Sequence, residues 1–168
     1  MTDQNLTLIL TRHAKSDWVE GQSDHDRPLT ARGRTDALAL GRHLAAQGPT
    51  PALTLCSTAQ RTQETAELIT GALPEHPQRL LADLYHAGPL AMLTALRQAD
   101  APVVLMVGHN PGIASFAGKL LARHHDDPRF DSYPSGATTI ITFENANWPA
   151  LEFGAGQLQS FIVPRDLT

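Results

Sequence analysis

LTLILTRHAKSDW (Leu6–Trp18) is the stretch of the sequence that decides the fold. Its first five residues, Leu6–Leu10, are mostly apolar, and a short apolar run without helical gaps is typical of a strand that is covered on both faces. The chain then continues into Arg12, His13 and Lys15. A surface turn tolerates such side chains, whereas a binding site for an anion requires them.

Strand-like and helix-like segments alternate along the rest of the chain. This order predicts an α/β fold, because parallel strands are joined through helices that cover both faces of their sheet. We therefore expect a three-layer sandwich with a mostly parallel central sheet and an antiparallel edge from the C-terminal part. The predicted strands are 6–10, 52–56, 102–108, 138–143 and 158–163, and the predicted helices are 31–46, about 58–70, 90–96 and 111 to about 122.

Capping residues mark where three of these helices begin. Thr30 directly precedes the first helix and is expected to be its N-cap. Ser57 begins the S-x-x-Q pattern of a capping box for the second helix. Asn110 is expected as the N-cap of the last helix, with Pro111 at its first helical position.

The composition indicates one globular domain over residues 1–168. Apolar residues make up 42% and charged residues 18% of the sequence, close to globular averages. The formal net charge of −4 argues against a nucleic-acid partner, because such proteins usually carry a basic excess. No apolar run approaches the roughly 20 residues of a membrane helix, and the N-terminus lacks the basic start of a signal peptide. The single cysteine excludes an internal disulfide. We expect a cytoplasmic protein with no membrane partner.

Three of the predicted strands end in side chains of one chemical kind. Arg12 and His13 follow the first strand, Arg61 lies just beyond the second, and His109 follows the third. In open α/β sheets, binding sites form outside the carboxyl ends of the strands. Two arginines, two histidines and two helix N-termini are thus expected to converge on one spot, a combination that suits a phosphate dianion. Arg61 agrees with this, because the helix dipole disfavours a cation in a first turn unless an anion binds there.

Five short motifs occur in an order that resembles a known family. They are LTRHAKSDW, DRPLTARG, CSTAQRTQETA, LYHAG and VGHNPG, spread from Thr7 to about Gly112, and PSGATTIITF near the C-terminus is also in keeping. In this order and spacing they resemble the motifs of the histidine phosphatase superfamily, specifically its small branch typified by the SixA phosphohistidine phosphatase. The resemblance implies the phosphoglycerate mutase-like fold.

The resemblance also implies catalytic roles for four residues. His13 is the expected nucleophile, which takes the phosphoryl group onto a ring nitrogen and gives a phosphohistidine intermediate that water hydrolyses. Arg12 and Arg61 are expected to hold the phosphoryl oxygens, with His109 completing the cationic pocket. His13 must be neutral to attack, and neither a metal nor another cofactor is needed. The family's usual Arg-His-Gly ends here in Ala14, which reduces backbone freedom beside the nucleophile.

Three further candidates complete the predicted site. Larger relatives use a carboxylic acid to protonate the leaving oxygen, and Asp83 in LLADLYHAG is the candidate, with a solvated carboxylate or a helix cap as an equal interpretation. Ser57 either binds a phosphoryl oxygen or only caps its helix. Lys15 adds positive potential at the rim or is simply exposed. Asp24 is expected to fix the loop before the first helix through ion pairs.

Two other interpretations of the sequence are less favoured. Cys56 and Arg61 invite comparison with the cysteine phosphatases, but too few residues separate them, none is glycine, and Cys56 ends an apolar strand as a small buried hydrophobe does. RHHDDP (Arg123–Pro128) contains metal-ligating residue types. Adjacent residues point in different directions, however, so a solvated helix end is the better interpretation.

The expected substrate is a phosphohistidine on another protein, such as a histidine phosphotransfer domain. Only about 15 residues separate His13 from the first helix, so no long segment encloses the site and the pocket is expected to be shallow and open. A small-molecule phosphomonoesterase on the same scaffold is one alternative. A module that binds phosphate or a phosphoprotein without turnover is the other, and it is disfavoured because His13, His109 and both arginines are retained.

Overall fold

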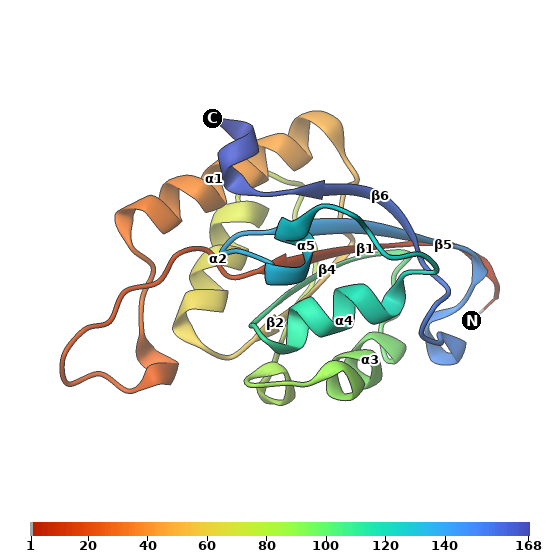
Figure 1. Ribbon diagram of the computed structural model, residues 1–168, viewed down its shortest axis with the longest axis horizontal. Helices are drawn as coiled ribbons and strands as arrows, with labels where there is room; N and C mark the ends of the chain where they lie inside the picture. Colours follow the sequence, from red (N-terminus) through yellow and green to blue (C-terminus); the bar gives the residue numbers. More distant parts are fainter. Residues whose placement is uncertain (1) are drawn as a thin grey trace.

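A six-stranded sheet lies between two layers of helices in the computed structural model, which describes residues 2–168 (Figure 1). The strand order is β3-β2-β4-β1-β5-β6, in which β3 to β1 are parallel and β5 and β6 are added antiparallel at one edge. The predicted three-layer α/β architecture is confirmed.

The strands are β1 (Gln4–Arg12), β2 (Leu53–Ser57), β3 (Gln78–Leu81), β4 (Val103–Gly108), β5 (Thr138–Ala146) and β6 (Gln157–Ile162). The helices are α1 (Ala31–Gln47), α2 (Gln60–Thr70), α3 (Pro89–Arg97), α4 (Gly112–Leu120) and α5 (Pro128–Ser132).

The central strands β1 and β4 contribute to two separate hydrophobic cores. Leu8 and Leu10 of β1 pack into the core that α3 and α4 cover, whereas Ile9 between them packs into the core under α1 and α2. Val104 and Met106 of β4 likewise pack into the first of these cores, and Leu105 between them packs into the second. Because strand side chains alternate with a period of two, burial on both faces explains why both strands are mostly apolar without an alternation of polar residues.

The helices divide between the two faces of the sheet. Helices α1 and α2 pack against each other over one face, and α3 and α4 lie over the other (Figure 1). Trp148, after β5, is fully buried, and its indole N–H donates to the carbonyl oxygen of Ala101 at 2.6 Å. No helix within residues 2–168 combines the length and the apolar character that a membrane crossing needs.

The predicted N-cap of α1 is confirmed. The predicted strands and helices are also largely confirmed, with small shifts at their ends. Thr30 is the N-cap of α1, and its Oγ1 accepts a hydrogen bond from the Gly33 amide at 3.0 Å. The helix ends at Gly48, whose φ of 71° lies in the region that favours glycine. Thr30 also donates its own amide to the Lys15 carbonyl oxygen at 2.9 Å, which ties the start of α1 to the segment after β1.

Two predicted caps are wrong. Helix α2 has Ala59 as its N-cap, because the Ser57 hydroxyl is engaged with the His109 ring at 2.7 Å and accepts only a long bond from the Ala59 amide, at 3.3 Å. Helix α4 has Pro111 as its N-cap, because the Asn110 side chain donates to backbone carbonyl groups at the end of α5. Both polar side chains therefore form tertiary hydrogen bonds in place of the local ones that their sequence patterns indicate.

Two other segments differ from the sequence-based expectation. Strand β3 was not predicted, because its four residues, QRLL, form an edge strand with partly exposed side chains and carry no apolar run. The segment Arg123–Pro128 is not a helix end, since α4 already stops at Leu120. Asp127 in that segment instead caps α5, accepting a hydrogen bond from the Arg129 amide at 2.9 Å.

A close backbone contact positions the loop that precedes α3. A Cβ atom on Gly112, the first residue of α4, would lie 1.8 Å from the carbonyl oxygen of Ala87. Only glycine allows this approach, which holds the Tyr85–Gly88 loop against the start of α4. Gly118, in the same helix, has no heavy atom within 4 Å of the corresponding Cβ position.

Gly112→Ala is expected to lower the free energy of unfolding by about 1–3 kcal/mol, because the added methyl group forces α4 and the Ala87 backbone apart. Gly118→Ala is the matched control and is expected to stabilise the protein by up to about 1 kcal/mol, since alanine is the better helix former. Urea unfolding midpoints of the two variants measure the difference. Equal midpoints would contradict the contact.

Candidate active site

The predicted site residues come together at the carboxyl ends of β1, β2 and β4. Arg12 is the last residue of β1 and His13 follows it, Arg61 lies in the first turn of α2, and His109 follows β4. These four side chains line one cavity of about 420 Å³, and Lys15 lines it as well. The remaining lining residues are Ser16, Trp18, Asp24, Arg27, His86, Asn110 and Ser135.

His13 is buried, and one of its ring nitrogens is bound to the backbone. Nδ1 lies 2.7 Å from the carbonyl oxygen of Ala14. Because a carbonyl group only accepts, Nδ1 carries the ring proton and donates it, which leaves the lone pair on Nε2. The backbone of His13 is also fixed, donating to the Gly108 carbonyl at 3.1 Å and accepting from the Gly136 amide at 3.0 Å. A nucleophilic nitrogen is thus held in one orientation.

The environment keeps the His13 ring neutral. Its pKa is lowered to about 4, mainly by burial and further by the positive charges of Arg12, Arg61 and Arg27, while the hydrogen bond to the Ala14 carbonyl acts in the opposite direction. At neutral pH the imidazole is therefore unprotonated at Nε2. This is the form that can attack an electrophile.

His109 is a neutral histidine that lines the cavity. Its Nε2 lies 2.7 Å from the hydroxyl oxygen of Ser57, and that oxygen also accepts from the Ala59 amide. The direction of this bond sets the tautomer of His109: when the Ser57 hydroxyl donates to Nε2, the ring proton of His109 is on Nδ1. This Nδ1 is buried and has no hydrogen-bond partner within residues 2–168. The pKa of His109 is lowered to about 3, first by burial and then by His13 and Arg61.

Two guanidinium groups supply the positive charge of the cavity. Arg12 Nη1 donates to the carbonyl oxygen of Tyr133 at 3.0 Å. Arg61 is anchored by Asp24, with Nη1 donating to its backbone carbonyl at 2.6 Å and Nη2 to its carboxylate at 3.0 Å. The pKa of Arg12 is lowered by burial and by the charge of Arg61, which means that the two cations repel each other. An oxyanion bound between them removes that repulsion.

Asp24 is a site residue whose role the sequence pattern did not reveal. Its carboxylate pairs with Arg61 at 3.0 Å and Arg27 at 3.1 Å and accepts a hydrogen bond from the Tyr85 hydroxyl. The Tyr85 hydrogen bond, then Arg61 and Arg27, hold the pKa of Asp24 far below its ordinary range, against the effect of burial. His86 Nε2 lies 3.7 Å from the same carboxylate. For Asp24 the sequence predicted only ion pairs within its loop. The available signal for a role in the site was the DRPLTARG motif that follows Asp24.

Asp83 does not join this cavity. It lies in the short 3-10 helix at 82–84 and lines a separate cavity beside α3. Its predicted role as the acid that protonates a leaving group therefore lacks geometric support, because a proton donor must reach the leaving atom. Ser57 contacts the site through His109 and is not among the lining residues, whereas Lys15 lines the cavity as expected.

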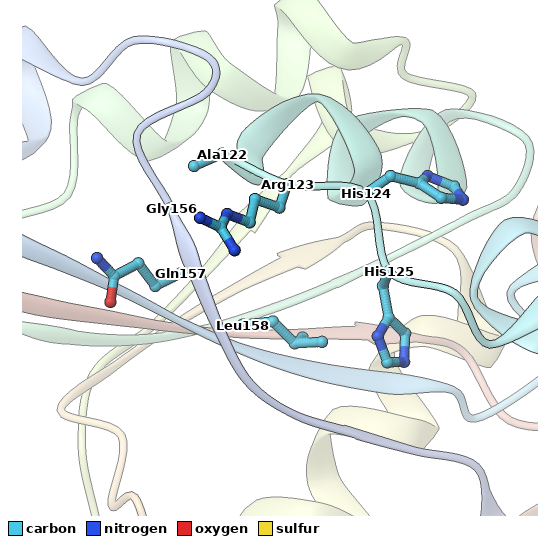
Figure 2. Close-up of a pocket in the computed structure, with 7 residues that line it drawn as sticks. All are labelled: Ala122, Arg123, His124, His125, Gly156, Gln157 and Leu158. Carbon is cyan, nitrogen blue, oxygen red and sulfur yellow. The ribbon is translucent and has the colours of Figure 1, made fainter.

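The two alternative sites considered from the sequence are not formed. Burial raises the pKa of the Cys56 thiol to about 12, so it is protonated and unsuited to attack. Within residues 2–168, no group of three or more His, Cys, Asp or Glu residues is arranged to hold a metal ion. Arg123, His124 and His125 line a separate cavity beside the start of β6, where the two imidazoles point in different directions (Figure 2).

Comparisons with known proteins identify the family of this chain. The sequence matches the family model of the histidine phosphatase superfamily (branch 1) over residues 8–88, which include Arg12, His13 and Arg61. An uncharacterized protein of Mycobacterium tuberculosis is 32% identical over 161 residues, which cover 92% of this chain and 99% of that protein. A solved structure, assigned as the phosphohistidine phosphatase SixA of Nakamurella multipartitia, is 29% identical, with 98% and 99% of the two chains covered and a TM-score of 0.83. The chain belongs to the histidine phosphatase superfamily.

Within the superfamily this histidine phosphatase falls in the small SixA-type branch, which makes it a phosphatase. A protein histidine phosphatase SixA complexed with tungstate has the same phosphoglycerate mutase-like fold, with 19% identity and a TM-score of 0.77 over 97% of this chain and 100% of that chain. The alanine that replaces the family's glycine fits without strain. Ala14 is not among the residues with positive φ, and its amide donates to Thr65 Oγ1 at 3.0 Å.

His13 and His109 of this histidine phosphatase are expected to remain neutral well below pH 6.5, the ordinary pKa of a histidine. Burial and neighbouring cations disfavour the charged ring, so protonation is expected only as the pH falls towards about 4 for His13 and about 3 for His109. NMR titration of the ring resonances measures both. Arg61→Gln removes a cation and is expected to raise the His13 midpoint, whereas a wild-type midpoint near 6.5 would contradict the assignment.

Proposed function

We propose that this histidine phosphatase hydrolyses phosphohistidine on another protein, with His13 as its nucleophile. One observation carries the proposal: the His13 ring, with its Nδ1 bound to the Ala14 carbonyl and its lone pair on Nε2, lines the same cavity as Arg12 and Arg61. A neutral imidazole beside two guanidinium groups combines a nucleophile with a binding site for the charge that it attacks. The similarity to structures assigned as phosphohistidine phosphatases supports the same reaction.

In the first step, the lone pair of His13 Nε2 attacks the phosphorus of the substrate. The new Nε2–P bond forms as the P–N bond of the substrate breaks, and its electron pair leaves with the departing imidazole. Arg12 and Arg61 hold the equatorial oxygens, and the Nδ1–H of His109 is a further donor to them. The Ala14 carbonyl accepts from Nδ1 of His13 and stabilises the positive charge that develops on the ring.

In the second step, water attacks the phosphorus of the intermediate. The Nε2–P bond breaks, its electron pair returns to His13, and the water releases one proton to solvent as inorganic phosphate forms. His13 is then neutral again and ready for a further cycle. The two steps replace one difficult displacement with two easier ones.

The position of Asp83 favours a phosphoramidate substrate over an ordinary phosphate ester. An alkoxide leaving group needs a positioned acid, whereas the imidazole of a phosphohistidine leaves easily once it is protonated from solution. With Asp83 in another cavity, the candidate acid of the sequence pattern is not available to the leaving group. The open rim also favours a protein-borne group: Trp18, 76% exposed, lies at the cavity and stacks on the Arg27 guanidinium at 3.7 Å.

A small phosphomonoester is the second candidate substrate, and His86 is the observation that favours it. The His86 imidazole lines the cavity and lies 3.7 Å from the Asp24 carboxylate. From this place a histidine ring can donate a proton to an alkoxide leaving group. Hydrolysis of the two substrate classes, measured side by side, separates the candidates.

Replacement of His13 by alanine is expected to lower turnover of a phosphohistidine-bearing protein by at least about a thousandfold, because the nucleophile is lost while both arginines remain. Steady-state hydrolysis of that protein and of p-nitrophenyl phosphate, without added metal, measures the effect and the substrate preference. His43→Ala on α1 is the matched control, since His43 lies outside the cavity. Near-normal turnover in His13→Ala would refute the covalent scheme.

Asp24→Asn and Asp83→Asn are expected to differ sharply, although both remove one carboxylate charge. Asp24→Asn is expected to lower kcat/KM by about tenfold, because Arg61 loses its ion pair and is then held less firmly, with the backbone carbonyl of residue 24 as its remaining charge-independent anchor. Asp83→Asn is expected to stay within about twofold of the wild type, because its side chain lies in another cavity. A loss in Asp83→Asn that is specific to ester substrates would restore Asp83 as the acid.

A further inference from the structure

The positive charges of this chain are concentrated around two adjoining cavities. The chain has 13 lysines and arginines and 17 aspartates and glutamates, so its formal net charge is −4. Seven of the 13 basic residues line the two cavities, together with only two acidic ones, Asp24 and Asp36. The seven are Arg12, Lys15, Arg27, Arg32, Arg61, Arg129 and Arg165. More than half of the basic residues of this net negative chain therefore lie around the two cavities.

The second cavity, which we name the basic groove, continues from the active site. Lys15 and Ser135 line both cavities, so the two share a boundary. The groove has a volume of about 660 Å³, larger than the roughly 420 Å³ of the active-site cavity. Its walls come from the segment after β1, the first turns of α1, α5 with the residues that follow it, and the C-terminal segment. Besides the two shared residues it is lined by Arg32, Asp36, Arg129, Pro134, Val163, Pro164 and Arg165.

Two of the four cations in the basic groove have no carboxylate partner. Arg32 pairs with Asp36 at 3.0 Å, and Arg129 pairs with two aspartates outside the lining, at 2.8 and 2.9 Å. Within residues 2–168, Lys15 and Arg165 are in none of the ion pairs of 4.0 Å or less. Their charge is free to attract an external anion.

Lys15 and Arg165 belong to segments whose backbone is held in place by hydrogen bonds and packing. The Lys15 carbonyl accepts the amide of Thr30, and a Cβ on Gly33 would lie only 2.1 Å from that carbonyl oxygen, so the start of α1 is pressed against Lys15. Arg165 lies in the C-terminal 3-10 helix at 164–167, which packs against α1, and Asp166 accepts a hydrogen bond from the Val163 amide at 3.2 Å. The groove is thus built from ordered segments on both sides.

We propose that the basic groove binds a carboxylate-rich segment of the phosphorylated protein, next to the phosphohistidine in the active site. The proposal rests on the proposed function, because a protein substrate must extend beyond the phosphoryl group. A phosphoryl group occupies the part of the site between Arg12 and Arg61, and the groove begins at Lys15 on its border. Glutamate or aspartate side chains of the partner then face Lys15 and Arg165, while the paired Arg32 and Arg129 add hydrogen-bond donors.

The test compares two phosphohistidine peptides that differ only in their flanking residues, which are glutamates in one and glutamines in the other. Phosphoimidazole is the small substrate that reports on the chemistry alone. The test variant is Arg165→Glu. The matched control is Arg123→Glu, an exposed arginine that lies beside Gly156 at the other end of β6 (Figure 2). All rates are measured at low salt and at about 0.5 M salt, where screening shortens the range of charge interactions to a few ångströms.

The wild type is expected to hydrolyse the glutamate peptide with a kcat/KM about tenfold above that of the glutamine peptide at low salt, and the preference is expected to fade at high salt. Arg165→Glu is expected to abolish the preference and to leave phosphoimidazole hydrolysis unchanged, whereas Arg123→Glu is expected to keep both. Absence of the preference in the wild type, or its survival in Arg165→Glu, overturns the groove while the phosphohistidine activity stands. If the wild type hydrolyses neither peptide nor phosphoimidazole, the proposed function fails and the groove proposal fails with it.

Discussion

Electrostatic repulsion between two guanidinium groups, one buried (Arg61) and one half-buried (Arg12), is the constraint on which the rest of the site depends. Arg12 and Arg61 are close enough for Arg61 to lower the pKa of Arg12. Each needs compensation, because burying a charge without a partner is costly. Arg12 receives it from the Tyr133 carbonyl, and Arg61 from the Asp24 carboxylate. Burial is the main cause of the low pKa that keeps the His13 ring neutral, and the same positive charges lower this pKa further, so the cations that favour a bound anion also favour the neutral ring.

The sheet topology explains how the nucleophile is held among these charges. Strand β1 lies between a parallel neighbour, β4, and an antiparallel neighbour, β5. The chain just beyond β1 is bonded to both sides, since His13 donates to Gly108 at the end of β4 and accepts from Gly136 before β5. A strand at the edge of the sheet would leave one of these bonds unmade. The central position of the first strand thus gives His13 a fixed backbone, on which the Ala14 carbonyl then fixes the ring.

Much of the fold and the centre of the site could be predicted from the sequence, because both depend on local patterns. Buried strands such as β4 are apolar runs, and polar residues after parallel strands meet at one edge of the sheet, which is why Arg12, His13 and His109 could be found. Side chains whose role depends on distant parts of the chain could not be assigned. Ser57 has the sequence pattern of a helix cap but binds a histidine that is 52 residues away.

The carboxylates show the same limit. Asp83 lies two residues before Tyr85 in the sequence and points into another cavity, whereas Asp24 accepts the Tyr85 hydrogen bond across 61 residues of chain. Only the folded loop between β1 and α1 brings Asp24 to Arg61, and no local pattern encodes that path. Strand β3 was missed for a related reason: its pairing with β2 defines it, while its own four residues lack an apolar run.

The proposed chemistry and the proposed partner selection use different parts of this fold. The proposed nucleophile and the two arginines beside it come from the end of β1 and the first turn of α2, whereas the basic groove comes mainly from α1, α5 and the C-terminal segment. At physiological salt, exposed charges interact only over roughly 8 Å, so a local group of cations outweighs the net negative charge of the chain for any partner that touches it. Two of the groove's arginines are held in place by aspartates that also neutralise their charge. Arg32 pairs with Asp36, and Arg129 pairs with Asp127 and Asp166. The attraction that we propose for an acidic partner is thereby left to Lys15, which lines both cavities, and Arg165, which lines the groove alone.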